Sequence, residues 1–488
     1  MQILGNREVK RNKINYIKLL IFFMIQKLGE LLSNLFLKFM PNAFVFAILL
    51  TLTIALGSFF WVDTSIFEII KSWYTGFFDL IGFAMQIALI IITGFSIALS
   101  PLVKRGIDVL SKNLKTPSQV YLLVVFIGLL LSLISFGWLV ITAVLARELA
   151  LRVKGVHYPY LIACVYFSFN SWVFGLSSSI PLLLNSKKNF LIETGILTKV
   201  IPTSLTLQSS LNLVMILFMA ISAPIVMYIL RPKSSKNKEL KDLMISDEEL
   251  EKRTIKEEAS SLNLPFKTLS DRLNNSVLLQ MIIVAMGLSY IVYHFSTKGL
   301  DLNFNIMIFI FIMFGMLLHK TPSRYVISMK RSSSNISGVL FQYPFYAGIM
   351  GIMLYTGLGD KLGQLMASVA TLETYPLFAY LTGGIVNFAI PSAGGEFAVI
   401  GPSLINAVIE LGAGLPETQV TAMIARASLS AAYGESLSNM LQPFFLLIII
   451  PIMGKGIKLQ SRDVMGYLVL PFILFFIIQT LLVVYWPL

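Results

Sequence analysis

Residues 375–411 read YPLFAYLTGGIVNFAIPSAGGEFAVIGPSLINAVIEL, an apolar segment with a turn sequence at its centre. A bilayer core of ~30 Å takes about 20 helical residues to cross. The 37 residues of this segment are too many for one crossing and too few for two crossings with a turn. Its centre, Pro391-Ser392-Ala393-Gly394-Gly395, is disfavoured inside a continuous helix. The segment therefore predicts a re-entrant helical hairpin, which enters the membrane and returns on the same side.

The composition indicates a membrane protein. Of 488 residues, 56% are hydrophobic and only 13% are charged, whereas a soluble domain carries about a quarter charged residues. The net charge of +13 lies in short connections between apolar runs, where the positive-inside rule places it, so it does not indicate a nucleic-acid partner. Cys164 is the only cysteine, which excludes disulfides within the chain and thiolate metal sites.

Seven apolar segments read as simple spans, and four contain an interruption. The simple spans are 41–61, 77–101, 208–230, 276–295, 303–319, 335–357 and 465–486. The interrupted segments are 119–153, 158–185, 375–411 and 418–450. Basic residues flank 119–153 on both sides, and Gly137 divides it, so this segment is also predicted to turn back.

Lys and Arg residues divide the connections between the two faces of the membrane. The richer set, predicted to be cytoplasmic, is 102–118, 147–157, 231–275, 320–334 and 451–464. The outer set is 62–76, 186–207, 296–302, 358–374 and 412–417. The chain is then a multi-pass inner (plasma) membrane protein with a cytoplasmic N-terminus.

Similar sequences in the two halves predict a repeat. Residues 83–94 resemble 341–352, which aligns Gln86 with Gln342, and a second similarity aligns Ser135 with Asn387. We expect two transmembrane repeats, 41–230 and 303–486, each ordered as span, span, hairpin, broken span and span. A connecting helix at 276–295 makes the number of crossings before the second repeat odd, so the repeats are inverted. Residues 1–40 are expected to form an amphipathic helix on the cytoplasmic surface, and 231–275 a charged cytoplasmic linker.

The predicted fold is an all-α polytopic membrane protein with two inverted repeats, each with a re-entrant hairpin and a broken transmembrane helix. Breaks of this kind persist only where protein or a water-filled cavity surrounds them, and in secondary transporters they form the substrate site. The predicted substrate-binding residues lie at these breaks and tips: Ser135, Gly137, Asn170, Ser171, Ser177, Ser178, Ser179, Asn387, Ser392, Gly394, Gly395, Tyr433, Gly434, Asn439 and Gln442. Several of these side chains either line the site or only satisfy the broken backbone.

Two carboxylates and three other polar residues have separate roles. Glu396 and Glu435 either bind a coupling H⁺ or Na⁺, or accept hydrogen bonds at a helix start. Gln86 and Gln342 are predicted to join helices through hydrogen bonds. Arg426 either faces the cavity or lies near the outer rim as a structural cation.

The ligand is predicted to be a small anion. The second hairpin's returning helix is expected to start near Glu396, and its free N–H groups and positive dipole end favour a carboxylate. An enzyme would need a metal site, a nucleophile with its base, or a cofactor loop, and none is visible. The prediction is therefore a non-enzymatic carrier without metal or cofactor; a channel would differ by passing single-channel currents.

Longer motifs resemble a known family, the bacterial short-chain fatty acid transporters, which carry acetoacetate and butyrate. The motifs are FAMQIALIIITG (83–94), YPYLIACVYF (158–167), GMLLHKTP (315–322), QYPFYAGI (342–349), VNFAIPSAGG (386–395) and YGE (433–435). The resemblance implies uptake of a short monocarboxylate, a coupling cation and a homodimer in the lipid bilayer.

Departures from the family pattern fall on the predicted site. The family's Pro-Ser-Gly-Gly-Gly tip contains Ala393 here, followed by Glu396, and Ser135 stands where an asparagine is expected. The resemblance therefore carries over the fold more firmly than the substrate. A carrier for a di- or tricarboxylate or an amino-acid derivative is the alternative.

Overall fold

The protein is described from a computed structural model. It describes residues 41–79, 81–176, 178–187, 189–233, 235–245, 254–262, 268–299, 303–333, 336–454 and 456–488, with Lys27, Leu31, Asn34, Leu35 and Lys38. The predicted amphipathic helix over 1–40 lies almost wholly outside these residues. Within them, seven helices are long and apolar enough to cross a membrane, and two bent helix pairs pass the same test.

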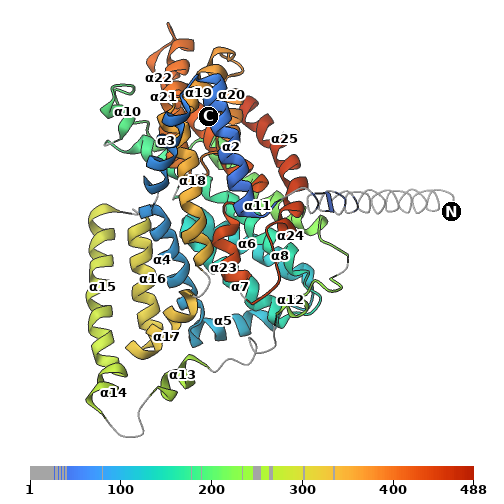
Figure 1. Ribbon diagram of the computed structural model, residues 1–488, viewed down its shortest axis with the longest axis vertical. Coiled ribbons are helices and arrows are strands. Elements are labelled where there is room, and N and C mark those ends of the chain that lie inside the picture. The colour runs from blue at the N-terminus through green and yellow to red at the C-terminus, as the bar shows by residue number, and fades with distance from the viewer. Residues whose placement is uncertain are drawn as a thin grey trace, which may run out of the picture.

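Two sets of helices follow one another in the same order. The first set is α2 (Ala43–Trp61), α3 (Ile66–Asp79), α4 (Ile81–Ala98), α5 (Pro101–Ser111), α6 (Pro117–Ile134), α7 (Leu139–Arg152), α8 (Tyr158–Phe169), α9 (Ser179–Asn185) and α11 (Ser210–Ile229). The second set is α16 (Phe304–His319), α17 (Pro322–Ser333), α18 (Ser337–Tyr355), α19 (Leu358–Ser368), α20 (Tyr375–Val386), α21 (Ala393–Leu411), α22 (Glu417–Ser438), α23 (Leu446–Met453) and α25 (Val469–Tyr485). Helix α15 (Val277–Lys298) lies between the sets and packs beside α16, which in turn packs on α4 (Figure 1).

Both predicted hairpins are present. Helices α6 and α7 pack against each other and are joined by a tip at 135–138. Helices α20 and α21 are joined by a tip at 387–392, where Pro391 cannot continue the α20 helix. The returning helix α21 begins at Ala393, three residues before the expected start near Glu396, because Ser392 is extended and serves as its N-cap residue. Gly394 and Gly395 therefore lie in the first helical turn rather than in the bend.

Both predicted broken spans are present as well. Helix α8 passes into a 3₁₀ turn, Asn170–Phe174, and an extended stretch before α9 begins. Helix α22 passes into a 3₁₀ turn, Asn439–Leu441, and the pair that it forms with α23 is bent by 47°. The hairpin and the broken span are in close contact in each half, since a Cβ added to Gly175 would lie 2.0 Å from the Leu133 carbonyl oxygen.

Small residues hold the two halves together. An added Cβ on Gly76 of α3 would lie 2.4 Å from the Cα of Gly351 on α18, so these two backbones touch. Membrane helices commonly associate through such contacts, because lipid gives no hydrophobic drive for their pairing. The crossing of α3 and α18 is a close backbone contact between the first and second sets of helices.

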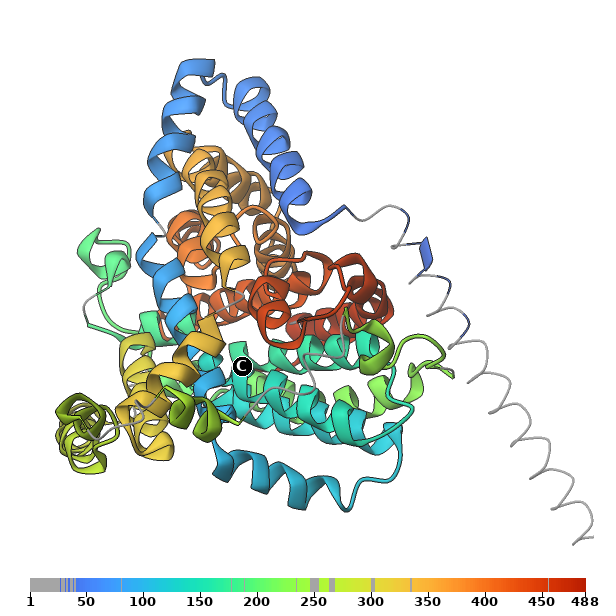
Figure 2. The ribbon, with the colours of Figure 1, turned by 60° about the horizontal axis from the view of Figure 1, so that its bottom comes forward.

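Four of the predicted connections between spans contain amphipathic helices. Helices α3, α5, α17 and α19 lie mostly within 62–76, 102–118, 320–334 and 358–374, for which the sequence predicted only a side of the membrane. Their charged residues resemble loop composition, while one face of each is apolar and packs on a neighbouring helix. Helix α5, for example, lies at the edge of the molecule and packs on α7 (Figure 2).

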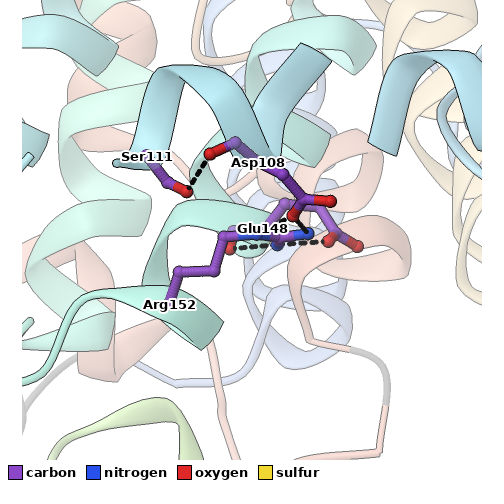
Figure 3. Close-up of polar contacts among 4 residues, drawn as sticks. All are labelled: Asp108, Ser111, Glu148 and Arg152. Atoms are coloured by element: carbon purple, nitrogen blue, oxygen red, sulfur yellow. Dashed lines mark hydrogen bonds and ion pairs between the residues drawn. The ribbon is translucent and has the colours of Figure 1, made fainter. Parts of the chain in front are cut away.

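An ion-pair group attaches α5 to the first hairpin. The Arg152 guanidinium at the end of α7 donates to Asp108 Oδ1 of α5 at 2.7 Å and to Glu148 Oε2 at 2.6 Å (Figure 3). Ser111 donates to the Asp108 carbonyl oxygen at 2.9 Å within α5. These contacts fix the position of the returning arm α7 relative to the peripheral helix.

The charged linker also makes a defined contact. Its helix α13 (Ile255–Ser261) packs Ile255 and Ala259 against Ile327 of α17. The Glu258 carboxylate on α13 forms an ion pair with the Arg331 guanidinium on α17. This part of the linker is therefore docked on the membrane helices rather than surrounded by solvent.

Candidate functional site

The two helix breaks lie against each other inside the protein. The Tyr166 hydroxyl on α8 donates to the carbonyl oxygens of Asn439 at 2.6 Å and Gln442 at 2.9 Å. Ser436 on α22 donates to the carbonyl oxygen of Asn170 at 3.0 Å. Backbone groups released by one break are thus satisfied by side chains from the other repeat, which brings the predicted site residues of both halves together.

The second hairpin tip is joined to the second break by a chain of amides. Asn387 Nδ2 donates to Ser438 Oγ at 2.7 Å, and Gln442 Nε2 donates to the Asn387 carbonyl oxygen at 2.9 Å and to Asn439 Oδ1 at 3.0 Å. Asn439 Nδ2 lies 3.2 Å from the Glu435 carbonyl oxygen and 3.3 Å from Glu435 Oε1. One connected network therefore includes Asn387, Ser438, Asn439, Gln442 and Glu435.

The first tip and the first break are joined through serines. Ser132 Oγ, at the end of α6, lies 2.8 Å from Ser171 Oγ and donates to the Ser168 carbonyl oxygen at 3.1 Å. The Leu176 N–H donates to the Leu133 carbonyl oxygen at 2.8 Å. Ser171 itself donates to the Leu129 carbonyl oxygen at 3.0 Å, so this serine satisfies a backbone group of α6.

Asn212 of α11 connects the two breaks from a third direction. It donates to the Phe174 carbonyl oxygen at 3.0 Å and accepts from the Tyr433 hydroxyl at 2.9 Å. Tyr433 is fully buried and is therefore held by this bond rather than free to turn. The predicted binding residue Tyr433 is thus linked to the first break through Asn212, which bonds to the backbone of Phe174.

Six buried residues at the tips and breaks have polar atoms without a hydrogen-bond partner among the described residues. A buried polar atom without a partner costs about 1–3 kcal/mol, and such atoms are uncommon in native proteins. Their concentration marks the place where a ligand, an ion or water completes the bonding. The atoms are Asn170 Nδ2, Ser178 Oγ, Asn387 Oδ1, Glu396 Oε1 and Oε2, Glu435 Oε2 and Gln442 Oε1.

The two sides of this group differ in chemistry. Ser438 Oγ donates to the Glu435 carbonyl oxygen, so it must accept from Asn387 Nδ2, which fixes the Asn387 amide with Oδ1 unpaired. The Gln442 amide is fixed in the same way by its donation to a backbone carbonyl. The second tip and break thus present oxygen acceptors, while Asn170 and Ser178 of the first break present hydrogen-bond donors.

The remaining predicted binding residues lie close to these atoms or support them. A Cβ added to Gly394 would lie 3.9 Å from Ser179 Cβ, so the second tip reaches the start of α9. Gly137 lies against Ile90, Ser135 is buried at the first tip, and Ser392 is partly buried at the second. Gly434 is enclosed by Tyr380, and Gly395 by Met350 and Ile390. Ser177 lies outside the described residues.

The three structural polar residues lie away from the breaks. Gln86 Nε2 donates to Asn305 Oδ1 at 2.8 Å and joins α4 to α16. Gln342 lines a separate cavity of about 490 Å³ beside α2 and α23, and its Oε1 has no partner among the described residues. Arg426 donates to the carbonyl oxygens of Val483 and Val484 at 2.9–3.1 Å, at the C-terminal end of α25. This geometry places Arg426 at a helix end rather than in a cavity.

Sequence reasoning missed several residues that build the site. Tyr166, Ser132 and Asn212 hold the breaks, and Arg147 of α7 donates to the Ile452 and Met453 carbonyl oxygens at 3.1 and 3.0 Å. Arg147 thereby caps α23 at its C-terminal end, a favourable place for a cation. Asn212 lies in the first turn of the apolar helix α11, and an amide side chain at the start of a membrane span is the signal that could have identified it.

Paired hairpin tips and broken helices, buried at one point of a multi-pass helical protein, define a membrane transport protein. The family model described as short chain fatty acid transporter matches residues 24–486. The chain therefore belongs to the short-chain fatty acid transporter family.

Two relatives and two solved structures can be compared in detail. The Haemophilus influenzae protein provisionally named short-chain fatty acid transporter is 32% identical over 449 residues, 91% of this chain and 96% of the relative. The Escherichia coli K12 protein of the same provisional name is 33% identical over 445 residues, again 91% and 96%. Neisseria gonorrhoeae MtrF, described with a class of antimetabolite efflux pumps, is 16% identical with a TM-score of 0.39, covering 95% of this chain and 97% of that one. The Alcanivorax borkumensis YdaH transporter is 14% identical with a TM-score of 0.36, covering 83% and 85%.

Proposed function

We propose that this protein is a secondary active carrier for short-chain monocarboxylates such as butyrate or acetoacetate, coupled to a cation. Family membership supports the substrate class. The observation that carries the proposal for this chain is the group of unpaired polar atoms at the tips and breaks, with donors on one side and acceptors on the other.

The substrate carboxylate is expected on the donor side. Asn170 Nδ2 and Ser178 Oγ offer N–H and O–H groups to a carboxylate, which accepts hydrogen bonds only. The apolar chain of the substrate would then lie among buried side chains of the breaks, such as Phe174 and Ile180. A short apolar tail with a single carboxylate suits a site in which the described residues provide neutral donors and no cationic side chain to anchor a further carboxylate.

The acceptor side suits a coupling cation. Glu435, Asn387 and Gln442 present oxygen atoms without donors, and carboxylate and amide oxygens are the ligands preferred by hard cations. A cation bound there lowers the cost of bringing an anion into the site. Coupling thus follows from the electrostatics of the site and from the same unpaired oxygens.

Alternating access is proposed to come from movement of the hairpins and broken spans. In each half these elements pack closely together, as α6 does on α8 and α20 on α22. At the crossing of α3 and α18 the backbones of Gly76 and Gly351 touch, which supports treating these two helices as part of the element that does not move. We propose that α2–α4 and α16–α18 form the frame, in a protein with a cytoplasmic N-terminus that assembles as a homodimer.

Uptake into proteoliposomes tests the function. Purified protein should take up labelled butyrate faster than protein-free liposomes when a Na⁺ or H⁺ gradient is imposed, with saturation at rising substrate concentration. Competition by unlabelled monocarboxylates and not by dicarboxylates is expected. Absence of protein-dependent uptake under both gradients would contradict the proposal, and stronger competition by dicarboxylates or amino-acid derivatives would reassign the substrate.

A further inference from the structure

Two carboxylates without a fixed counter-charge are buried in the site. Glu396 on α21 and Glu435 on α22 are both 0% exposed, and the two helices that carry them pack against each other. Glu396 accepts no hydrogen bond at either oxygen from the described residues, and Glu435 accepts one from the Asn439 amide. Both side chains are therefore much less satisfied than buried carboxylates usually are.

Two arginines on helices next to the breaks are engaged elsewhere. Arg426 is held at the end of α25 and Arg147 at the end of α23, each by backbone carbonyl oxygens. The other ionisable groups brought toward this region, Tyr166 on α8 with Tyr343 and Tyr346 on α18, are neutral phenols. Among the described residues, no Lys, Arg or His forms an ion pair with either glutamate.

The charge of the loaded site determines what must travel with the substrate. A monocarboxylate beside two ionised glutamates would place three negative charges in a buried region, at a cost of several kcal/mol for each uncompensated charge. We infer that two positive charges enter with each monocarboxylate, one neutralising Glu396 and one neutralising Glu435. This inference rests on the proposed function and deepens it, because it sets the charge that each transport cycle moves.

The surroundings of the two glutamates assign different partners to them. Glu435 belongs to the network that contains the unpaired oxygens of Asn387 and Gln442, so a Na⁺ ion or a proton can be held there. No hydrogen bond among the described residues joins Glu396 to that network, and a proton is the cation that needs no further oxygen ligands. With two positive charges and one anion, each cycle carries one net positive charge in the direction of the substrate.

Substrate-evoked current measures this charge directly. We would reconstitute the full chain on a solid-supported membrane, add butyrate under equal and under opposed Na⁺ and H⁺ gradients, and follow labelled butyrate exchange in the same preparation. Passive entry of undissociated butyric acid moves no charge, so it does not contribute to the measured current. The wild-type protein should give a positive current with the substrate, and Glu396→Gln should abolish this current while butyrate exchange persists. Glu410→Gln, an exposed carboxylate on the same helix α21, is the matched control and should keep the current.

Each result has a distinct meaning. Butyrate flux with no current in the wild-type protein indicates one cation per anion and overturns this inference while the proposed carrier function stands. A current of negative sign indicates an uncoupled anion and overturns both cation coupling and this inference. Absence of protein-dependent butyrate flux overturns the proposed function together with it. If Glu396→Gln does not fold, the sign of the wild-type current still decides whether two positive charges accompany each monocarboxylate.

Discussion

At the scale of single residues, the site is defined by what its polar atoms lack. Among the described residues, Asn170 and Ser178 offer buried donors with no acceptor, while Asn387, Gln442 and Glu435 offer acceptors with no donor. Such atoms are uncommon in native proteins, and a bound ligand, ion or water is one way in which their bonds are completed. The separation of donors from acceptors is the physical basis for assigning an anion to one side and a cation to the other.

Removing a donor should weaken substrate binding and leave the fold intact. Asn170→Ala and Ser178→Ala each remove one hydrogen bond to a charged carboxylate, worth about 1.5–3 kcal/mol. We expect KM for butyrate to rise about tenfold or more in each variant, with little change in thermal unfolding. Ser289→Ala, at an exposed position on α15, is the control. An unchanged KM in both variants would remove these residues from the binding site.

A histidine at the edge of the membrane should make stability depend on pH. His157 Nδ1 accepts from the Tyr160 N–H at 3.3 Å and so caps α8. Burial, with a smaller effect of the Lys238 charge, lowers the pKa of His157 from 6.5 to about 4. The unfolded chain therefore takes up a proton near pH 6.5, which the folded protein resists until about pH 4. The stabilisation is complete above pH 6.5 and is lost as the pH falls toward 4, by roughly 3 kcal/mol.

Thermal unfolding between pH 7.5 and 4.5 measures this effect. The wild-type protein should lose stability more steeply over that window than His157→Gln, which keeps a hydrogen-bond acceptor and does not titrate. Parallel pH curves for the two proteins would show that His157 is not responsible.

At the scale of elements, the sequence predicted the unusual segments better than the ordinary connections. The Pro-Ser-Ala-Gly-Gly centre of 375–411 and the paired basic flanks of 119–153 identify the hairpins, because turn residues and charge obey local rules. Helices α3, α5, α17 and α19 were missed because their charged faces resemble loops, and only their packing reveals the apolar face. The sequence left two positions open for Arg426, a cavity or the outer rim, because the choice depends on tertiary contacts. The structure places its guanidinium at the end of α25.

Close packing between a hairpin and a broken span should make Gly434 intolerant of substitution. A Cβ at this position would lie 1.9 Å from the Tyr380 carbonyl oxygen of α20. We expect Gly434→Ala to destabilise the protein by about 1–3 kcal/mol, since α20 and α22 must move apart. Gly82→Ala is the matched control, because an added Cβ there meets no atom within 4 Å. A melting temperature of Gly434→Ala equal to that of the control would show that this packing is not tight.

At the scale of the whole molecule, we propose that the function depends on two hairpins that enter the membrane from opposite sides. Each repeat alone provides only one tip and one break, and the bonds of Tyr166 and Ser436 show that the two breaks complete each other. The order of elements and the inverted relation could be read from segment lengths and charges. The hydrogen bonds between the repeats could not be predicted from the sequence, since they join residues more than 250 positions apart.

Cysteine accessibility at the ends of both hairpins is the most direct measurement of this arrangement. Single cysteines would replace the exposed residues Lys115 and Lys154 at the ends of the first hairpin, and Glu373 and Ala413 at those of the second, in a Cys164→Ala background. A membrane-impermeant maleimide applied to intact cells should leave positions 115 and 154 unlabelled and label both 373 and 413. Labelling of 115 and 154 from opposite faces would contradict the account.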